Sequence, residues 1–476
     1  MILNSLNEIP EFNDVVIIGS GPAGITTALQ LEEKGISSII FEAGDLDFNE
    51  KSQNFYKGNV IGDEYPDLTT ARLRQFGGTS GHWGGNCTSL DSYDFQNWPI
   101  SKTDLQEYET KSYNILNIEG NFYKKRFNND LDIFNLNWSN VRFKEKYYSK
   151  IKKSKKISLI LNCPVVMMNG EKGVVHHATF LKDKLKNIKS KYFVLSTGGI
   201  ENSRLLLWFK KNNKDLLDNK LPIGNYWMDH PYHSVAEGVL FKKNFDVFLK
   251  KRKIQNYVDT DCNYSFFFSP NKTSIDKFDL LNSSVNIGIT KPKSSSFQNS
   301  KFMQLKCLAP QLIKNLLFSE KEFNHYDFNI SILSDQKPSF KNRIELASEK
   351  DSNGIPIPNL YWEREHNVRN SSKKIIETLA KFLIDEEIGR LAAEDFLFTN
   401  KKYLHQNGYH HMGGTRMGNK TNSSVVNADL KVHYTKNLFI NGSSVFSTAG
   451  HAYPTLTITQ LALRLGDHIS KLINQI

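Results

Sequence analysis

Histidine and tyrosine side chains near the carboxyl end of the chain are the residues best suited to acid–base chemistry. His410 and His411 stand together before a glycine-rich segment, and His451 and Tyr453 follow later in the same region. An imidazole exchanges a proton near neutral pH and can take the proton of a hydroxyl group, and a tyrosine hydroxyl can donate a hydrogen bond. The alternative for the His410–His411 pair is a supporting role in the fold through hydrogen bonds.

A helix predicted from Pro454 to about residue 473 follows these side chains directly. Proline is well placed as the first residue of a helix, because its missing N–H costs nothing there. The free N–H groups of Thr455 and Leu456, together with the helix dipole, would present positive potential to a ligand. The helix also carries an apolar face, as expected of an ordinary amphipathic helix packed on a core.

A dinucleotide-binding pattern stands at the opposite end of the chain. The apolar run 15–18 is typical of a buried parallel strand, and Gly19, Gly21 and Gly24 match the pattern G-x-G-x-x-G. The first glycine allows a tight turn, and the second lets the backbone approach a pyrophosphate. The third lets the following helix pack closely on the strand.

The residues around this turn continue the pattern. Pro22 and Ala23 lie within it, a helix is predicted over residues 25–34, and a second strand over 37–41. Glu42 ends that strand, where an acid accepts hydrogen bonds from a ribose hydroxyl. The pattern predicts a bound nucleotide without separating FAD from NAD.

A second glycine-rich stretch, residues 72–86, surrounds His82 and Trp83. So many glycines indicate a backbone held close to a flat ligand, and the alternative is an ordinary flexible loop. A nucleotide motif at one end and histidines before a helix at the other suggest a fold that brings its two ends together around a flavin. That arrangement points to redox chemistry.

Composition limits the classes of protein to which the chain can belong. At 476 residues, two domains are the prior expectation. The net charge of +11 comes from lysines clustered between apolar segments. These clusters indicate either an anionic partner or solvated loops, and we favour loops because no aromatic-basic stripe or nucleic-acid motif accompanies them.

Cysteine usage and the absence of targeting signals predict a cytoplasmic protein. The four cysteines are far apart without a CxxC, which suits reduced thiols better than disulfides or a metal site; they are Cys87, Cys163, Cys262 and Cys307. No signal peptide is visible, and no apolar run is long enough to span a membrane.

The middle of the chain alternates in a way typical of strands. Alternating stretches predict an antiparallel sheet, and they lie at 233–241, 264–268, 327–333 and 343–346. Strands are also predicted at 157–162, 192–196 and 438–441, and helices at 203–210 and 369–383. Segments of the nucleotide-binding type therefore flank a sheet-rich insertion.

In their joint order, these segments make the chain resemble the glucose-methanol-choline (GMC) oxidoreductases. Within that family it is most similar to the branch of pyranose oxidases and glycoside dehydrogenases. The matching segments are 19–24 with Glu42, 77–85, 97–101, 163–165, 194–206, 228–231, 335–338 with 342–344, and 410–467.

The resemblance implies an α/β fold with a Rossmann-like FAD-binding domain and an inserted, antiparallel-sheet substrate-binding domain. The FAD-binding domain would comprise residues 1–100, 156–235 and 405–476, and the substrate-binding domain 101–155 and 236–404. It also implies FAD as the cofactor, bound by Gly19, Gly21, Pro22, Ala23, Gly24, Glu42, Arg74, Gly78, Thr79, His82, Trp83, Val165, Gly442, Pro454 and Thr455. His82 matches the position at which pyranose oxidases attach the flavin covalently, but other members carry a similar segment without that bond.

The resemblance assigns the catalytic base to His410. The family's second catalytic position, usually Asn or His, falls on Tyr453, which is a departure. Either Tyr453 takes over this role, or His451 reaches the substrate instead, or the chemistry has changed.

The leading hypothesis is an FAD-dependent dehydrogenase or oxidase that converts an alcohol, often a sugar or glycoside hydroxyl, to a carbonyl. The acceptor of its electrons is not readable from the sequence. Two alternatives stay open at this point: an FAD-containing lyase or isomerase on the same fold, and a catalytically silent FAD-binding protein.

Overall fold

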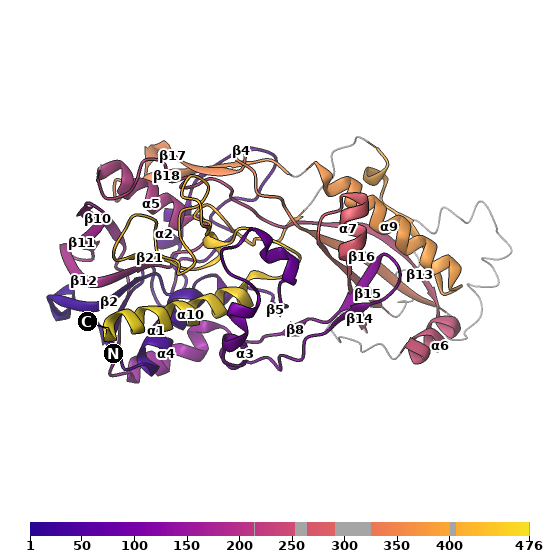
Figure 1. Ribbon diagram of the computed structural model, residues 1–476, viewed down its shortest axis with the longest axis horizontal. Coiled ribbons are helices and arrows are strands. Elements are labelled where there is room, and N and C mark those ends of the chain that lie inside the picture. The colour runs from indigo at the N-terminus through magenta and orange to yellow at the C-terminus, as the bar shows by residue number, and fades with distance from the viewer. Residues whose placement is uncertain (214, 253–263, 291–324, 365, 400–405, 476) are drawn as a thin grey trace.

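The computed structural model describes residues 1–213, 215–252, 264–290, 325–364, 366–399 and 406–475. The chain forms two lobes side by side along the long axis (Figure 1). Both termini lie in the lobe at the left of that figure, and the right-hand lobe is built from the middle of the chain.

A mostly parallel sheet forms the centre of the left-hand lobe. Its order is β1-β9-β3-β2-β12-β11-β10. Strand β21 pairs with residues 193–195 of β12, whereas β11 pairs with residues 185–188. The pairings among β1, β9, β3, β2, β12 and β21 are parallel, whereas β10 and β11 add an antiparallel edge. The strands are β1 (Ile2–Leu3), β2 (Phe12–Ile18), β3 (Ser38–Phe41), β9 (Ile157–Ile160), β10 (Val165–Glu171), β11 (Val174–Leu181), β12 (Leu185–Leu195) and β21 (Leu438–Ile440).

Apolar residues explain why these short strands lie at the centre of the lobe. Val15, Val16 and Ile17 of β2 are fully buried, as expected of a strand covered on both faces. The cover includes α1 (Pro22–Glu33), α4 (Phe143–Lys153), α5 (Glu201–Asn212) and α10 (Pro454–Asn474). The shorter helices α2 (Glu50–Gln53) and α3 (Glu109–Leu116) belong to the same lobe.

The two ends of the chain meet at the contact between α1 and α10. Adding a Cβ to Gly466 would place it 2.7 Å from the Cβ of Gln30, so the two helices cross closely. The side chain of Gln30 donates a hydrogen bond to Asp467 over 2.5 Å. This contact confirms that the fold brings its ends together.

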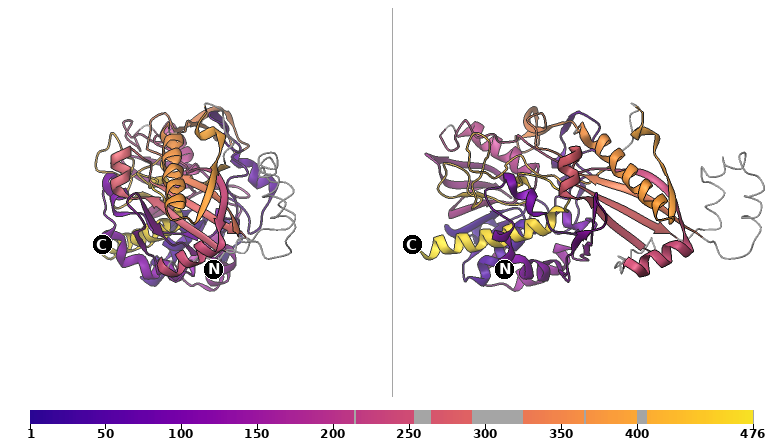
Figure 2. Two further views of the ribbon diagram at one scale, coloured as in Figure 1. Left: turned by 90° about the vertical axis from the view of Figure 1, so that its right-hand side faces the viewer. Right: turned by 45° about the vertical axis from the view of Figure 1, so that its right-hand side comes forward.

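An antiparallel sheet forms the right-hand lobe, in the order β19-β13-β16-β15-β14-β7-β6, with β20 paired to β13. Its strands are β6 (Lys124–Arg126), β7 (Leu131–Phe134), β13 (Pro231–Phe241), β14 (Tyr264–Pro270), β15 (Ser283–Thr290), β16 (His325–Ser334), β19 (Gly389–Ala393) and β20 (Gln406–Asn407). Figure 2 shows helix α9 (Asn367–Asp385) lying across one face of this sheet. Helices α6 (Lys242–Arg252) and α7 (Lys272–Phe278) also belong to this lobe.

One predicted strand lies in a different sheet from the one we expected. Residues 343–346 belong to β17 (Arg343–Lys350), which pairs with β18 (Pro356–Trp362) rather than with the large antiparallel sheet. Strand β18 pairs in turn with β4 (Asn59–Gly62), 300 residues earlier by the register Asn359 to Asn59. The prediction was wrong because alternation identifies a strand but not its partner. A fourth, two-stranded sheet joins β5 (Asn86–Cys87) to β8 (Asn137–Trp138).

The overall architecture confirms the predicted fold class, a Rossmann-like nucleotide-binding lobe with an antiparallel-sheet insertion. The domain boundaries given above stay a prediction. In the part of the chain that the structure describes, no helix combines the length and the apolar character needed to cross a bilayer.

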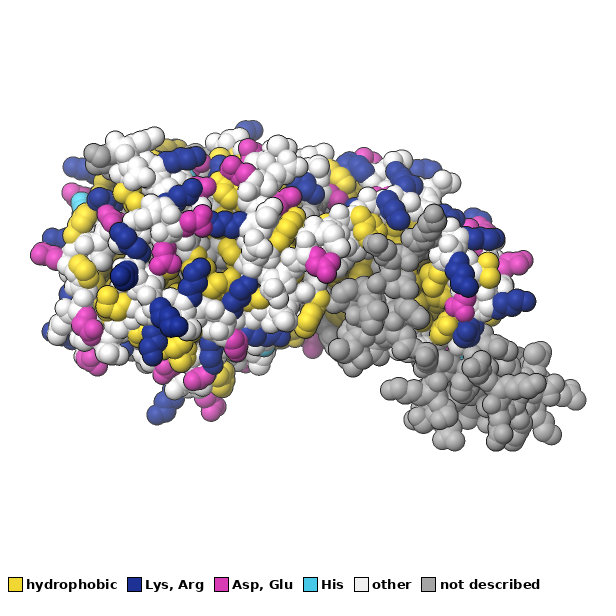
Figure 3. Space-filling view, turned by 90° about the horizontal axis from the view of Figure 1, so that it is seen from below, with side chains coloured by type: hydrophobic (Ala, Val, Ile, Leu, Met, Phe, Trp, Pro, Cys, Tyr) yellow, Lys and Arg dark blue, Asp and Glu magenta, His cyan; other side chains and the backbone are white. Residues whose placement is uncertain are grey.

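Surface charge is mixed on the face that Figure 3 shows. Lysine and arginine side chains alternate there with acidic ones, and no continuous basic stripe runs over that face. This distribution fits the interpretation of solvated lysine-rich loops. Cys87 and Cys163 are buried free thiols, and Cys262 and Cys307 lie outside the described residues.

Candidate active site

A cavity of about 690 Å³ runs from the glycine-rich turn after β2 to the antiparallel sheet. Of the predicted cofactor-binding residues, all but Gly24 line it. Gly24 has a different task, because a Cβ there would lie 2.1 Å from the carbonyl oxygen of Gly19. It allows the start of α1 to pack on the turn, as the third glycine of the pattern requires.

The turn itself leaves room for a ligand. Gly19 adopts a φ of +103°, and a Cβ there would lie 2.5 Å from the carbonyl oxygen of Ser196. A Cβ on Gly21, by contrast, would meet no protein atom within 4 Å, although the residue lines the cavity. Gly21 is also the N-cap of α1 and has no capping side chain, so the helix begins against open space. This cradle fits the pyrophosphate of a dinucleotide.

Glu42 holds this turn together as well as lining the cavity. Its Oε2 accepts hydrogen bonds from the backbone N–H of Ser20 over 3.0 Å and from the Ser20 hydroxyl over 2.6 Å. Its Oε1 accepts from the backbone N–H of Gly44 over 2.7 Å. Each carboxylate oxygen has more than one acceptor site, so Glu42 keeps capacity for a ribose hydroxyl.

The second glycine-rich stretch reaches the cavity from the opposite direction. Gly78 lies against Gly21, since a Cβ on Gly78 would be 3.1 Å from the Gly21 Cα. The Arg74 guanidinium covers the ring of Phe55 at 4.6 Å and donates to the Ser52 hydroxyl over 2.6 Å. Phe55 and its neighbour Tyr56 also line the cavity, and the sequence analysis missed both. No motif marks them, because α2 and the residues after it have no recognisable pattern.

The rings of His410 and His411 face different neighbours, as expected of adjacent residues in an extended segment. His410 lies edge-on to Tyr453, with ring centroids 5.3 Å apart. The ring of His411 instead lies 6.2 Å from that of Tyr65 and 5.8 Å from that of Trp227. Burial lowers the pKa of His410 well below its ordinary value, and the nearby His230 lowers it further. His410 is therefore a neutral imidazole that can accept a proton.

Tyr453 and the helix after it bound the same part of the cavity. Tyr453 is the N-cap of α10, makes no side-chain capping hydrogen bond, and is followed by Pro454. Tyr453, Pro454 and Thr455 all line the cavity. The first turn of α10 therefore directs its uncapped N–H groups and positive dipole end at this space. Such an end stabilises negative charge on a ligand.

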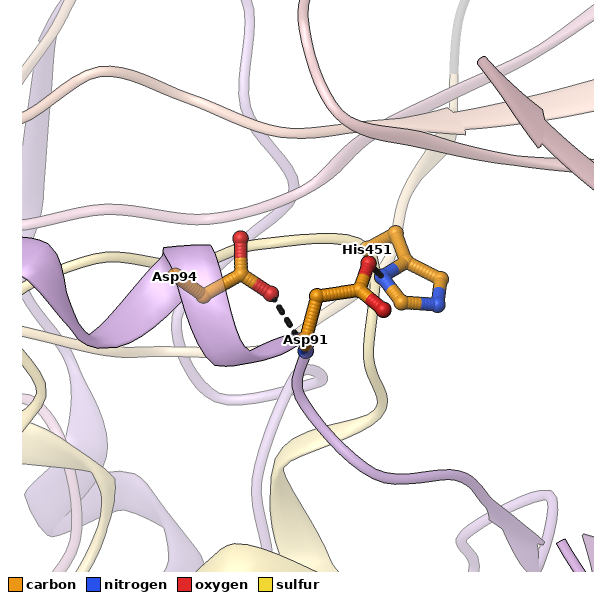
Figure 4. Close-up of side chains that lie close together, drawn as sticks. All are labelled: Asp91, Asp94 and His451. Atoms are coloured by element: carbon orange, nitrogen blue, oxygen red, sulfur yellow. Dashed lines mark hydrogen bonds and ion pairs between the residues drawn. The ribbon is translucent and has the colours of Figure 1, made fainter. Parts of the chain in front are cut away.

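His451 is not among the residues that line the cavity. It is buried, its Nδ1 lies 3.3 Å from Asp91 Oδ2, and its ring packs edge-on against Phe134. Figure 4 shows His451 directed at Asp91, while Asp94 contacts the Asp91 backbone from the adjoining helix. Of the two residues considered for the second catalytic position, only Tyr453 is next to His410.

The cluster of Asp91, Asp94 and His451 is the one group among the described residues whose ligand atoms are spaced for a metal ion, all within 4.8 Å. The Lys124 ammonium already lies 2.6 Å from Asp91 Oδ2 and supplies positive charge there. Burial, together with the charge of Asp91, raises the pKa of Asp94 to about 8. The cluster therefore balances its charge with protein groups.

Strands of the antiparallel sheet form another part of the cavity wall. Their cavity-lining residues are uncharged and mostly polar, among the described strands: Tyr232, Ser265, Phe267, Ser284, Asn286, Ser331 and Leu333. The Asn286 Oδ1 is buried without a hydrogen-bond partner. Hydroxyl and amide groups of this kind bind a neutral, hydrogen-bonding ligand.

Comparisons with known proteins find two family models and two relatives that are similar to this chain. A family model described as GMC oxidoreductase matches residues 338–462, and one described as an FAD-binding domain matches 14–47. The chain is 24% identical to a 2-methyl-1,2-propanediol dehydrogenase of Mycolicibacterium austroafricanum, over 97% of this chain and 96% of that protein. It is 25% identical to the fructose dehydrogenase large subunit of Gluconobacter japonicus, over 59% of this chain and 47% of that protein.

Solved structures share the fold. Pyridoxine 4-oxidase from Mesorbium loti matches with a TM-score of 0.61 and 12% identity, over 96% of this chain and 99% of that one. Formate oxidase matches with a TM-score of 0.57 and 15% identity, over 98% and 99% of the two chains. Together with the cradle described above, the family models confirm FAD as the cofactor.

Proposed function

We propose that this protein oxidises an alcohol to a carbonyl compound. Both family models support a GMC oxidoreductase with FAD as its cofactor. The substrate that fits best is a small, neutral, polyhydroxylated molecule such as a sugar, a glycoside or a diol. The two relatives are named for such molecules, one for a diol and one for fructose. The narrower resemblance to pyranose oxidases and glycoside dehydrogenases stays a prediction.

The observation that carries the proposal is the pair of His410 and Tyr453, 5.3 Å apart between ring centroids on the cavity wall. The neutral His410 removes the proton of the substrate hydroxyl. Tyr453 donates a hydrogen bond to the same oxygen and stabilises the charge that develops on it. Bound FAD supplies the acceptor for the hydride that leaves the carbinol carbon.

The N-terminus of α10 supports the same reaction. The uncapped first turn that contains Thr455 supplies positive potential at the cavity wall, where it would stabilise negative charge on a reduced flavin held there. The sheet strands that line the cavity hold the rest of the substrate through hydroxyl and amide groups.

Anaerobic flavin bleaching tests this proposal. The purified protein should be yellow, and monosaccharides, alkyl glycosides and small diols are mixed with it without oxygen. Loss of the yellow colour with at least one of them supports alcohol oxidation. Reoxidation of the reduced flavin by oxygen or by an artificial dye then distinguishes an oxidase from a dehydrogenase.

A flavin that stays oxidised with every alcohol, while the protein retains FAD, would contradict the proposal. That result would favour the lyase, isomerase or silent alternatives. Tyr453 in place of the family's usual Asn or His is the feature that keeps the lyase or isomerase alternative open.

A further inference from the structure

His230 is a second buried histidine in direct contact with His410. It lies just before β13, its exposed fraction is 0%, and its Nδ1 is 2.8 Å from the Nδ1 of His410. The two rings stand at 90° with centroids 5.0 Å apart. A contact of this length between two nitrogens is a hydrogen bond, so one of the two atoms carries a hydrogen and the other a lone pair.

The other ring nitrogen of His230 decides which of the two is the donor. Its Nε2 lies 3.0 Å from the carbonyl oxygen of Gly450. A carbonyl oxygen can only accept, so Nε2 must carry the hydrogen. Burial lowers the pKa of His230 to about 4, so the ring is neutral and has a single N–H. Its Nδ1 therefore presents a lone pair, and His410 Nδ1 must be the donor.

His230 also joins the two loops that contain the proposed catalytic side chains. Its Nδ1 contacts the ring of His410, and its Nε2 contacts Gly450, three residues before Tyr453. Each loop has a further anchor nearby. Asp229 Oδ1 accepts from the backbone N–H of His410 over 2.7 Å, and Asp335 Oδ1 accepts from that of Gly450 over 2.9 Å.

We propose that His230 is a positioning residue, which holds His410 in the tautomer with its hydrogen on Nδ1 and its lone pair on Nε2. The hydrogen-bonded series runs from the Gly450 carbonyl through His230 to His410. It leaves the Nε2 of His410, on the far side of the ring from His230, as the nitrogen that takes the proton of the substrate hydroxyl. This inference rests on the proposed function, in which His410 is the base.

Two conservative substitutions separate the two contacts of His230. In His230→Asn, the amide branches at the same position as Nδ1 and can present its oxygen to the His410 N–H. In His230→Gln, the amide reaches the position of Nε2 and can donate to Gly450, but it offers no acceptor to His410. Asn thus preserves the contact with His410 Nδ1, whereas Gln preserves the contact with the Gly450 carbonyl.

The inference predicts that anaerobic flavin reduction is slowed more by Gln than by Asn. We expect a loss of about a hundredfold in His230→Gln, at the lower end of what removal of a base costs. His230→Asn should be at least about tenfold faster than His230→Gln. The reverse order would show that His230 only anchors the loop and would overturn the inference. His468→Gln on α10, away from the cavity walls, is the matched control and should reduce normally.

The tautomer can also be observed without any substrate. Two-bond ¹H–¹⁵N correlation spectra of the FAD-loaded, ¹⁵N-histidine-labelled protein report which ring nitrogen carries hydrogen. The signal of His410 among the 13 histidines is identified by its loss in His410→Gln. We expect a protonated Nδ1 and an unprotonated Nε2 in the unmodified chain, and a protonated Nε2 would overturn the inference.

This measurement keeps the two proposals apart. If no alcohol reduces the flavin but His410 has its hydrogen on Nδ1, the proposed function fails while the tautomer assignment holds. If alcohols reduce the flavin but Nε2 is the protonated nitrogen, the function holds and the role of His230 fails.

Discussion

The two halves of the cavity are built in different ways. The nucleotide-binding half contains a turn at which glycines let the backbone approach closely, and its principal motif is contiguous over residues 15–42. The half around His410 consists of side chains from the start of β13, from the loops before β21 and α10, and from the antiparallel sheet. At Gly19 and Gly24 a Cβ has no room, so substitutions there strain the backbone. A side-chain site can be altered one group at a time.

The largest expected effect is in the nucleotide-binding half. Gly24→Ala places a Cβ 2.1 Å from the Gly19 carbonyl oxygen, so the turn must shift or α1 must separate from it. We expect almost no FAD-loaded protein, measured as flavin absorbance per protein after purification. Steric conflict in a well-packed interior typically costs about 1–3 kcal/mol, and here the conflict is with rigid backbone.

Gly21→Ala is the matched control for this steric argument. Its Cβ meets no protein atom within 4 Å, so the thermal stability of the FAD-free protein should be unchanged. FAD affinity should nevertheless fall, because the open space next to Gly21 is where the pyrophosphate approaches. Unchanged FAD affinity in Gly21→Ala would place the cofactor elsewhere in the cavity.

The next largest effect is expected at the proposed base. His410→Ala should retain FAD but slow anaerobic flavin reduction by about a hundredfold to ten-thousandfold. His411→Ala should affect the chemical step much less, because its ring faces Tyr65 and Trp227 instead of Tyr453. Single-turnover reduction of both variants decides the assignment. The opposite order would show that His411 is the base.

Tyr453→Phe tests the departure from the family pattern. Loss of one hydrogen-bond donor to a developing oxyanion costs roughly 3–4 kcal/mol in a closed site, so reduction should slow by about a hundredfold to a thousandfold. His451→Ala should leave the chemical step comparatively intact, because His451 contacts Asp91 outside the cavity walls. A damaging His451→Ala together with a silent Tyr453→Phe would assign the role to His451.

The smallest effect is expected on the sheet wall. Asn286→Ala removes an amide whose Oδ1 is buried without a partner next to the cavity. One hydrogen bond to a neutral substrate contributes about 0.5–1.5 kcal/mol, so kcat/KM should fall roughly threefold to tenfold. FAD content should not change. An unaltered kcat/KM across all alcohols that reduce the flavin would exclude Asn286 from substrate binding.

The same contrast explains which parts of the site were predictable. The turn at Gly19–Gly24, the acid at Glu42 and the helix that begins at Pro454 each follow from a local pattern, and all lie where that pattern puts them. Residues such as Phe55 were missed, because they reach the cavity only through the folding of a segment without periodicity. The sequence placed His230 in a segment that matches the family, but it did not predict the contact with His410, because the two residues are 180 positions apart.

By itself, the sequence determined the nucleotide-binding turn and the histidine pair at residues 410–411, and its resemblance to the GMC oxidoreductases implied the fold class and FAD. Local steric limits and hydrophobic periodicity are properties of neighbouring residues, so they can be read along the chain. The tertiary structure alone decided that residues 343–346 pair with β18, in the sheet that also contains β4, rather than with the large sheet. It also decided that Tyr453 and not His451 stands beside His410, and that His230 joins the two loops. These are pairings between distant segments, and no local pattern specifies them because they arise from the way that whole elements pack.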